Sequence, residues 1–178
     1  MRYVALLRAI NVGGHTVKMD RLRALFEELG YRNVETFIAS GNVLFDAPAR
    51  PVAGIERKIE AHLLEALGYE VETFVRPLSA LADVLASHPF VTATEDGHQL
   101  YIGFVHGPIS DENSKRLAAI NTTIDFFHTG ECEIYWLCHR NMSETLVTMK
   151  SLEKAIGMPA TFRNVNTVRR LSAKATPP

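Results

Sequence analysis

The sequence predicts an α+β protein in which short apolar strands alternate with amphipathic helices. Apolar residues recur at helical spacing over residues 17–29 and 52–67, and a glycine follows each stretch where a helix C-terminus favours one. Four short apolar runs with the length of strands lie around these helices; they cover residues 2–8, 34–39, 42–46 and 71–76. The order is therefore strand, helix, strand, strand, helix, strand.

Two parts of this first half carry nearly the same letters. Gly30-Tyr31 leads into VETFI at residues 34–38, and Gly68-Tyr69 leads into VETFV at residues 71–75. Each copy is typical of a helix end, a turn and a strand. Two interleaved strand–helix–strand copies make the βαββαβ plait of the ferredoxin-like fold. We predict this fold for residues 1–77.

The sequence pattern of residues 78–178 predicts a second, smaller α+β subdomain packed on the first. The expected strands cover residues 100–105, 123–128 and 131–138. The expected helices cover residues 79–87, a stretch that begins after Ser110, residues 143–156 and residues 165–172. Ser110 and Asn164 are suitable N-cap residues for two of these helices.

The composition is that of an ordinary globular protein. The chain has 178 residues, of which 47% are hydrophobic and 22% charged, and this balance excludes a disordered chain. The longest apolar run, residues 3–12, contains Arg8 and is too short to span a membrane. It also lacks the cleavage pattern of a signal peptide. We therefore expect a cytoplasmic protein that does not bind membranes.

Cysteine and histidine spacing predicts no cofactor and no metal site. Cys132 and Cys138 lie in a predicted strand, roughly 20 Å apart at the usual rise per residue, and so cannot form a disulfide with each other. The seven histidines form no HExxH motif, and the chain has no CxxC motif.

The charge is nearly balanced overall but uneven along the chain. A net charge of -1 and an isoelectric point near 6.7 argue against a general nucleic-acid binder. Residues 1–23 nevertheless hold five basic residues and one acidic residue, and residues 161–178 hold four basic residues and no acidic residue. These ends form a positive patch if they meet in space, and are otherwise two separate solvated faces.

The predicted topology brings a set of polar residues and glycines to one edge of the sheet. The first two strands of a ferredoxin-like plait run parallel, so the loop after the first strand and the turn after the second lie at the same edge. The residues expected there are Arg8, Asn11, Gly13, Gly14, Lys18, Ser40, Gly41 and Asn42. Backbone N–H groups at the glycines, the helix start and the Arg8 guanidinium suit an anion. Arg163, beside Asn164, would close this site from the second subdomain.

Several of these residues also have a purely structural interpretation. Asn11 to Gly14 have good loop chemistry, Gly41 supplies a positive φ in a turn, Arg163 pairs with an acid, and Asn164 caps a helix. The chain contains no P-loop and no dinucleotide-binding motif, and Ser40 does not lie in a nucleophile elbow. The sequence therefore predicts a ligand site and reveals no reaction and no catalytic residue.

Several stretches match one family in sequence and in order. They are residues 7–14 (LRAINVGG), Met19 with Leu22, residues 39–42 (ASGN), residues 161–164 (TFRN), and Thr167 with Val168. In these stretches the chain resembles the bacterial family called domain of unknown function 1697. One position departs: the chain has His88 before Pro89 and Phe90, where the family often has Asn. The resemblance implies a ferredoxin-like half joined to a second α+β half, and it implies no activity.

The favoured hypothesis is a protein that binds a small anionic ligand, a nucleotide or a phosphorylated metabolite, at the predicted edge. The alternatives are a nucleic-acid-binding module and a protein-interaction module that use the plait sheet. RNA-recognition plaits stack bases on exposed aromatic residues, whereas the central strands here offer Val4, Leu6, Val43 and Leu44. The sequence predicts no oligomeric state.

Overall fold

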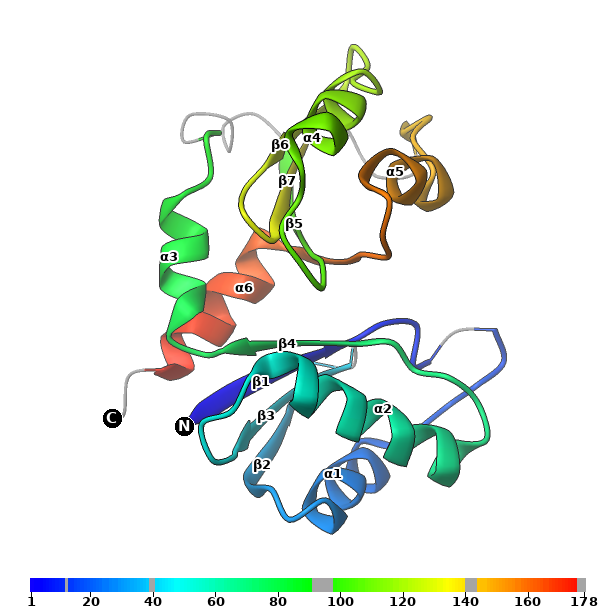
Figure 1. The fold of residues 1–178 in the computed structure, drawn as a ribbon, viewed down its shortest axis with the longest axis vertical. Coiled ribbons are helices and arrows are strands. Elements are labelled where there is room, and N and C mark those ends of the chain that lie inside the picture. Colours follow the sequence, from blue (N-terminus) through cyan, green and yellow to red (C-terminus); the bar gives the residue numbers. More distant parts are fainter. Residues whose placement is uncertain (12, 39–40, 91–97, 140–143, 176–178) are drawn as a thin grey trace. The chain divides into compact units, whose positions relative to one another are not determined.

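The structure is a computed structural model that describes residues 1–11, 13–38, 41–90, 98–139 and 144–175. The chain forms two compact units (Figure 1). The first consists of Met1–Leu81 together with Leu171–Pro178, and the second of Ala82–Arg170. Among the described residues, no helix combines the length and apolar character needed to cross a membrane.

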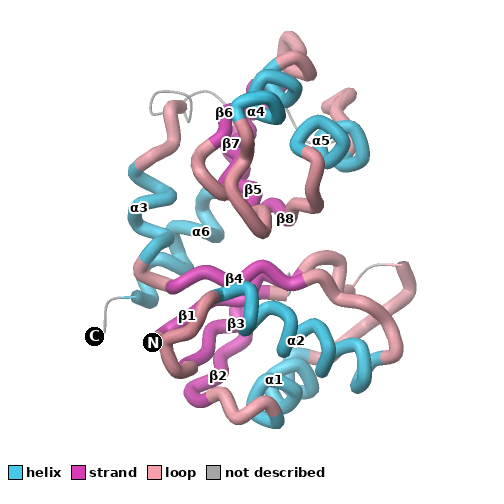
Figure 2. The backbone as a smooth tube through the Cα atoms, viewed as in Figure 1, coloured by secondary structure: helices cyan, strands magenta, loops and turns pink. Residues whose placement is uncertain are grey.

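The first unit has the predicted order of strands and helices. Its elements are β1 (Arg2–Leu7), α1 (Met19–Glu28), β2 (Arg32–Phe37), β3 (Asn42–Asp46), α2 (Val52–Leu67) and β4 (Thr73–Pro77). The sheet has the order β2-β3-β1-β4 (Figure 2). All neighbouring strands are antiparallel. Because β1 and β2 both run antiparallel to β3, they run parallel to each other. The predicted ferredoxin-like plait is confirmed.

Both helices of the first unit pack on one face of its sheet. Their apolar stripes and the inward residues of the strands form one core, which includes Tyr3, Ala5, Leu22, Leu25, Phe26, Val43, Phe45, Ile55, Ile59 and Leu63. Phe45 lies at its centre, with ring centroids 5.7 Å from Tyr3 and 5.5 Å from Phe26. Burial of each large apolar side chain contributes about 1.5–3 kcal/mol to stability. The amphipathic periodicity of α1 and α2 therefore fixes the layer arrangement.

The opposite face of this sheet is also buried. Val4, Leu6, Leu44 and Phe74 are fully buried on that face. Glu35 and Phe37 lie at the β2 end of it, where Lys174 forms an ion pair with Glu35 and lies 5.2 Å from the centroid of the Phe37 ring. Residues near the end of the described chain are therefore part of the first unit.

The second unit is a four-stranded antiparallel sheet with helices. Its strands are β5 (Gln99–Phe104), β6 (Asp125–Thr129), β7 (Glu133–Cys138) and β8 (Thr161–Asn164), in the order β6-β7-β5-β8. The helices are α3 (Ala80–Ala86), α4 (Asp111–Ala118), α5 (Met149–Ile156) and α6 (Val165–Ser172), and the unit boundaries fall within α3 and α6. Residues of α4, α5, β6 and β7 form a core around Trp136, including Leu117, Phe127, Ile134, Leu152 and Ile156.

Two elements of this unit differ from the sequence prediction. The helix expected over residues 143–156 begins at Met149, because Thr148 is extended and forms a reciprocal capping box with Ser151; residue 143 lies outside the described residues. The strand β8 was not predicted. It pairs with β5 and carries the buried Arg163, whose charge interrupts the apolar alternation by which a strand is recognised.

Candidate functional site

The start of β3 lies beside the end of β1. The Leu7 N–H donates to the Gly41 carbonyl over 2.8 Å, and Asn42 pairs with Leu6. These contacts bring the described part of the turn before β3 to the edge where the loop after β1 begins. Ser40 lies outside the described residues.

Arg8 has a carboxylate partner at this edge. Its Nη1 lies 2.8 Å from Glu72 Oε2, and its backbone N–H donates to the Glu72 carbonyl over 2.8 Å. Both side chains are about one-third exposed, at 34% and 28%. Glu72 therefore neutralises the Arg8 guanidinium, which the sequence analysis expected to bind an anion.

Three more of the proposed residues hold the backbone at this edge in place. Asn11 Oδ1 accepts from the Val17 N–H over 2.7 Å and closes the loop before α1. The side-chain amide of the buried Asn42 donates to the Phe37 carbonyl over 3.0 Å. Gly41 has a φ of 75°, and a Cβ there would lie 2.9 Å from Ile10 Cγ2. The contacts of Asn11 and the φ of Gly41 match the structural interpretations of these two residues, and Asn42 also has a structural role.

Gly13, Gly14 and Lys18 form the open part of the edge. The two glycines are exposed, with φ angles of 69° and 88°, and a Cβ at either would meet nothing within 4 Å. Lys18 is exposed and directly precedes α1, where it makes no side-chain cap. Within the described residues, the N–H groups of Met19–Arg21 have no acceptor. The backbone here is accessible, and the start of the helix carries unused donors.

An aromatic pair that the sequence did not predict lies beside this loop. The rings of His15 and Tyr69 stack with centroids 3.9 Å apart and an interplanar angle of 22°. The Tyr69 hydroxyl donates to the Ile10 carbonyl over 3.1 Å, and burial raises the pKa of this hydroxyl. Tyr69 therefore ties the loop after β1 to the turn after α2. The only signal in the sequence was its place in the repeated Gly-Tyr turn.

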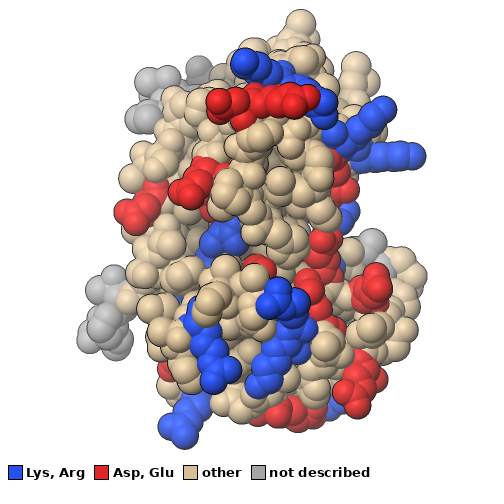
Figure 3. Space-filling view, viewed as in Figure 1, with Lys and Arg blue, Asp and Glu red and all other residues tan. Residues whose placement is uncertain are grey.

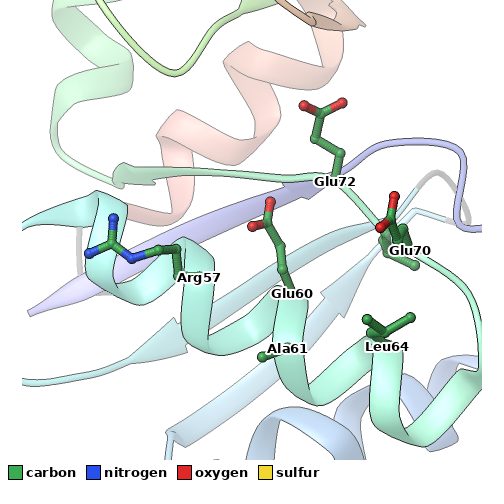
Figure 4. Close-up of a pocket in the computed structure, with 7 residues that line it drawn as sticks. Arg57, Glu60, Ala61, Leu64, Glu70 and Glu72 are labelled. Atoms are coloured by element: carbon green, nitrogen blue, oxygen red, sulfur yellow. The ribbon is translucent and has the colours of Figure 1, made fainter.

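Next to Glu72 lies an acidic groove of about 490 Å³ between α2 and the start of β4 (Figure 4). Glu60, Glu70 and Glu72 line it together with Arg57, Ala61, Leu64 and Val71. Glu60 Oε1 accepts from the Thr73 N–H over 2.9 Å, and Glu56 Oε1 accepts from the Val75 N–H over 2.8 Å. These carboxylates make the Arg8 side of the edge acidic.

Arg163 and Asn164 belong to the second unit. Arg163 is 9% exposed, and its Nη1 donates to Thr161 Oγ1 and to the Phe162 carbonyl, each over 2.9 Å. Burial lowers the pKa of Arg163 to about 10, so it stays protonated at neutral pH. Asn164 Oδ1 accepts from the Asn166 N–H over 2.9 Å, which confirms the predicted cap of α6. Closure of the edge by Arg163 stays a prediction.

Metal-ligating side chains do not gather in the described part of the chain: no three or more His, Cys, Asp or Glu residues are placed to hold an ion. Cys132 and Cys138 are both described, and they form no disulfide. Cys138 is buried in the core around Trp136.

The fold defines a two-unit α+β protein whose first unit is a ferredoxin-like plait with an exposed glycine loop. The chain belongs to the family described as "Protein of unknown function (DUF1697)", whose model matches residues 1–135. It is similar to the conserved bacterial protein SP0830 from Streptococcus pneumoniae, with 21% identity, a TM-score of 0.75 and 98% of each chain covered. That likeness shows the fold. A search of curated proteins found no significant match.

Proposed function

We propose that this protein binds a small anionic ligand, a nucleotide or a phosphorylated metabolite, through its phosphate at Gly13, Gly14 and the start of α1. The observation that carries the proposal is an exposed glycine pair followed by a helix whose first N–H groups have no acceptor among the described residues. Backbone donors and the helix dipole at such a place favour negative charge. Lys18 adds a positive charge at the same point.

The other residues of the edge support the site indirectly. Asn11 closes the loop that contains the glycine pair, Gly41 bonds the end of β1, and Asn42 bonds the end of β2. Arg8 is bonded to Glu72 and contributes by fixing the start of the loop. The ligand contacts thus reduce to backbone donors and one lysine, which suits a phosphate group more than a large organic molecule.

The test is a titration of inorganic phosphate, AMP and ribose 5-phosphate at constant ionic strength, followed by NMR of the backbone amides. We expect the amides of Gly13, Gly14 and the first turn of α1 to shift. Lys18→Gln should weaken binding by up to about fivefold, as expected for loss of an exposed ion pair of up to ~1 kcal/mol. Lys150→Gln, which removes an exposed lysine near the start of α5, is the matched control.

Two results would contradict the proposal. One is the absence of amide shifts at the glycine pair with all three compounds. The other is an equal effect of Lys18→Gln and Lys150→Gln, because a general salt effect would not distinguish the two lysines.

The sheet-based alternatives receive less support from the described residues. The central-strand residues Val4, Leu6 and Leu44 are aliphatic and fully buried, so they provide no stacking platform for bases. On the face drawn in Figure 3, acidic and basic side chains both occur in each unit. This mixed surface fits the balanced net charge rather than a nucleic-acid footprint.

A further inference from the structure

A cavity in the first unit is lined by the end of α1, the loop between β3 and α2, and the first two turns of α2. Its volume is about 410 Å³, within the usual range of small-molecule sites. Ala47, one of its lining residues, donates its N–H to the Met1 carbonyl over 3.1 Å and so lies beside the start of β1. The loop with Gly13 and Gly14 follows the other end of that strand. This cavity, the Tyr31 pocket, is therefore separate from the glycine loop.

Tyr31 lines the pocket with a hydroxyl that has no partner. The residue is only 8% exposed, and its ring packs in the core with centroids 4.6 Å from Phe45 and 6.2 Å from Phe26. Its hydroxyl makes no hydrogen bond to any residue that the structure describes, whereas a buried tyrosine hydroxyl usually finds a partner. Burial raises the pKa of this hydroxyl, and the charge of Arg50 opposes that rise. The hydroxyl is therefore a protonated donor at neutral pH, and an acceptor in the pocket would complete its bonding.

The basic side chains that line the Tyr31 pocket are Arg50, Arg57 and Lys58. Lys58 Nζ lies 5.3 Å from the centroid of the Tyr31 ring and donates to the Leu29 carbonyl over 2.8 Å, which holds it beside the ring. Arg57 also borders the acidic groove, but in Figure 4 its guanidinium points away from Glu60. Within the described ranges none of the three cations is ion-paired, and no acidic residue lines the pocket. The pocket is therefore positively charged.

The start of α2 adds backbone donors to the same pocket. Pro51, the N-cap residue, offers no side-chain cap, and the N–H groups of Val52 and Ala53 have no acceptor among the described residues. A Cβ at Gly54 would meet nothing within 4 Å, so the first turn of the helix is open to a ligand. Unused N–H groups and the positive end of the helix dipole favour an anion here.

We propose that the Tyr31 pocket binds a small phosphate monoester that carries an apolar organic group. The phosphate accepts from the Tyr31 hydroxyl and from the first N–H groups of α2, and the three basic side chains supply positive charge. The organic group contacts the apolar part of the lining, which includes Leu29, Ala47, Pro48 and Ile55. A phosphate monoester carries a charge of about −1.5 to −2 at neutral pH and three acceptor oxygens. It therefore suits several donors and three cations better than a carboxylate does.

The test compares three anions on the full chain at constant ionic strength, by NMR of the backbone amides. Phenyl phosphate has both the phosphate and an apolar ring, inorganic phosphate lacks the ring, and benzenesulfonate keeps the ring but carries a single negative charge. We expect the amides of Tyr31 and Val52–Gly54 to shift, and phenyl phosphate to bind roughly fivefold more tightly than either other probe. Shifts at Gly13 and Gly14 report on the other site, so each of the two proposals can fail alone.

Variants separate the hydroxyl from the charges. Tyr31→Phe keeps the ring in the core and should weaken the binding of phenyl phosphate roughly tenfold, as expected for a lost hydrogen bond to a charged group. Arg50→Gln should weaken it by up to about fivefold, as loss of an exposed ion pair implies. Arg23→Gln, which removes an exposed arginine of α1 that does not line the pocket, is the matched control and should change nothing. Amide spectra of each variant verify that it is folded.

Three results overturn the proposal. The first is the absence of shifts at Tyr31 and Val52–Gly54 with phenyl phosphate at millimolar concentration. The second is an affinity for phenyl phosphate no higher than that for inorganic phosphate or benzenesulfonate, which would remove the role of the ring or of the second charge. The third is an effect of Tyr31→Phe no larger than that of Arg23→Gln. The first two results come from the wild-type protein and do not depend on the folding of a variant.

Discussion

Asp125 is a buried carboxylate whose acceptor sites are used by three donors. Its Oδ1 accepts from Trp136 Nε1 over 2.9 Å, and its Oδ2 accepts from the hydroxyls of Thr145 over 2.8 Å and Thr122 over 3.0 Å. The residue is fully buried. A buried carboxylate is costly unless such bonds replace water. Asp125 thus links the indole at the centre of the core to two loops.

Removal of this carboxylate should destabilise the protein strongly. We expect Asp125→Ala to lower the free energy of unfolding by about 3 kcal/mol, because it leaves buried donors without an acceptor. Asp125→Asn keeps one oxygen acceptor and should cost less. The exposed Asp111→Asn is the control and should stay within about 0.5 kcal/mol. Urea denaturation measures all three, and a loss in Asp125→Ala no larger than in the control would refute this account.

His139 should make stability depend on pH. Burial lowers the pKa of its imidazole, the neighbouring His98 lowers it further, and Asp125 opposes both effects. The unfolded chain then takes up a proton near pH 6.5 while the folded chain is still neutral at this site. The unfolded state binds more protons, so the free energy of unfolding falls as pH drops below about 7.

The expected measurement has two parts. An NMR titration of the His139 ring should give a midpoint below 6.5, and His139→Gln should lose less stability than the wild type between pH 7.5 and 5.5. Burial and the charge of Arg169 also lower the pKa of His88, so part of the slope should remain in the variant. A ring midpoint above 6.5 would reverse the sign of the argument.

The sequence predicts residues whose role is confined to the backbone close to them in the chain. Gly41 and Asn164 were interpretable as a turn glycine and a helix cap, and the structure gives both these roles. The partner of Arg8 was not predictable, because Glu72 lies 64 residues away in the chain. Only the register between β1 and β4 brings that carboxylate to the edge of the sheet.

Helix α2 covers the outer edge of β4. Its outward backbone positions are Thr73, Val75 and Pro77, since Phe74 and Arg76 face β1. Glu60 accepts from the Thr73 N–H, Glu56 accepts from the Val75 N–H, and Pro77 has no N–H. An exposed edge strand is a template for pairing with another chain. Here α2 satisfies the donors that such pairing would need.

Glu60 should therefore protect the Thr73 amide from exchange with solvent. We expect Glu60→Ala to raise the hydrogen-exchange rate of that amide about fivefold, as loss of one ~1 kcal/mol hydrogen bond implies. Glu60→Gln keeps an acceptor oxygen and should retain most of the protection. Exchange measured by NMR distinguishes the two variants. Equal protection in Glu60→Ala and the wild type would show that the carboxylate does not guard this edge.

The elements of the first unit were predictable because their periodicity is regular and their ends carry glycine. The unpredicted β8 lacks these signals: it has only four residues and places the charged Arg163 inside. The late start of α5 has a local cause in the Thr148 and Ser151 capping box. The sequence contains this motif, but the apolar residues Leu146 and Val147 before it are also compatible with a helix that begins earlier.

The whole molecule is divided discontinuously along its chain. Leu171 and Lys174 belong to the first unit, although the stretch directly before them, Ala82–Arg170, forms the second unit. Leu171 is fully buried, and Lys174 reaches Glu35 across 139 positions in the sequence. No local sequence pattern predicts a contact between residues so far apart in the chain. Only the structure shows that these residues belong to the first unit.

Leu171 should carry most of the stability of this last segment. We expect Leu171→Ala to lower the free energy of unfolding by about 2–5 kcal/mol, as for other fully buried leucines. Lys174→Gln should cost no more than about 1 kcal/mol, because its ion pair with Glu35 is half-exposed. Denaturant unfolding of both variants tests this order. A larger loss in Lys174→Gln than in Leu171→Ala would contradict it.

The discontinuous first unit has a consequence for synthesis on the ribosome. Synthesis runs from the N-terminus, so residues 1–81 emerge before residues 82–170, which follow as one uninterrupted stretch. Leu171 and Lys174 leave the exit tunnel after all of the second unit has been made. While the second unit is being translated, Lys174 is therefore not available to contact Glu35 and Phe37 of the nascent plait. The unit whose residues emerge earlier is therefore the one that is completed later.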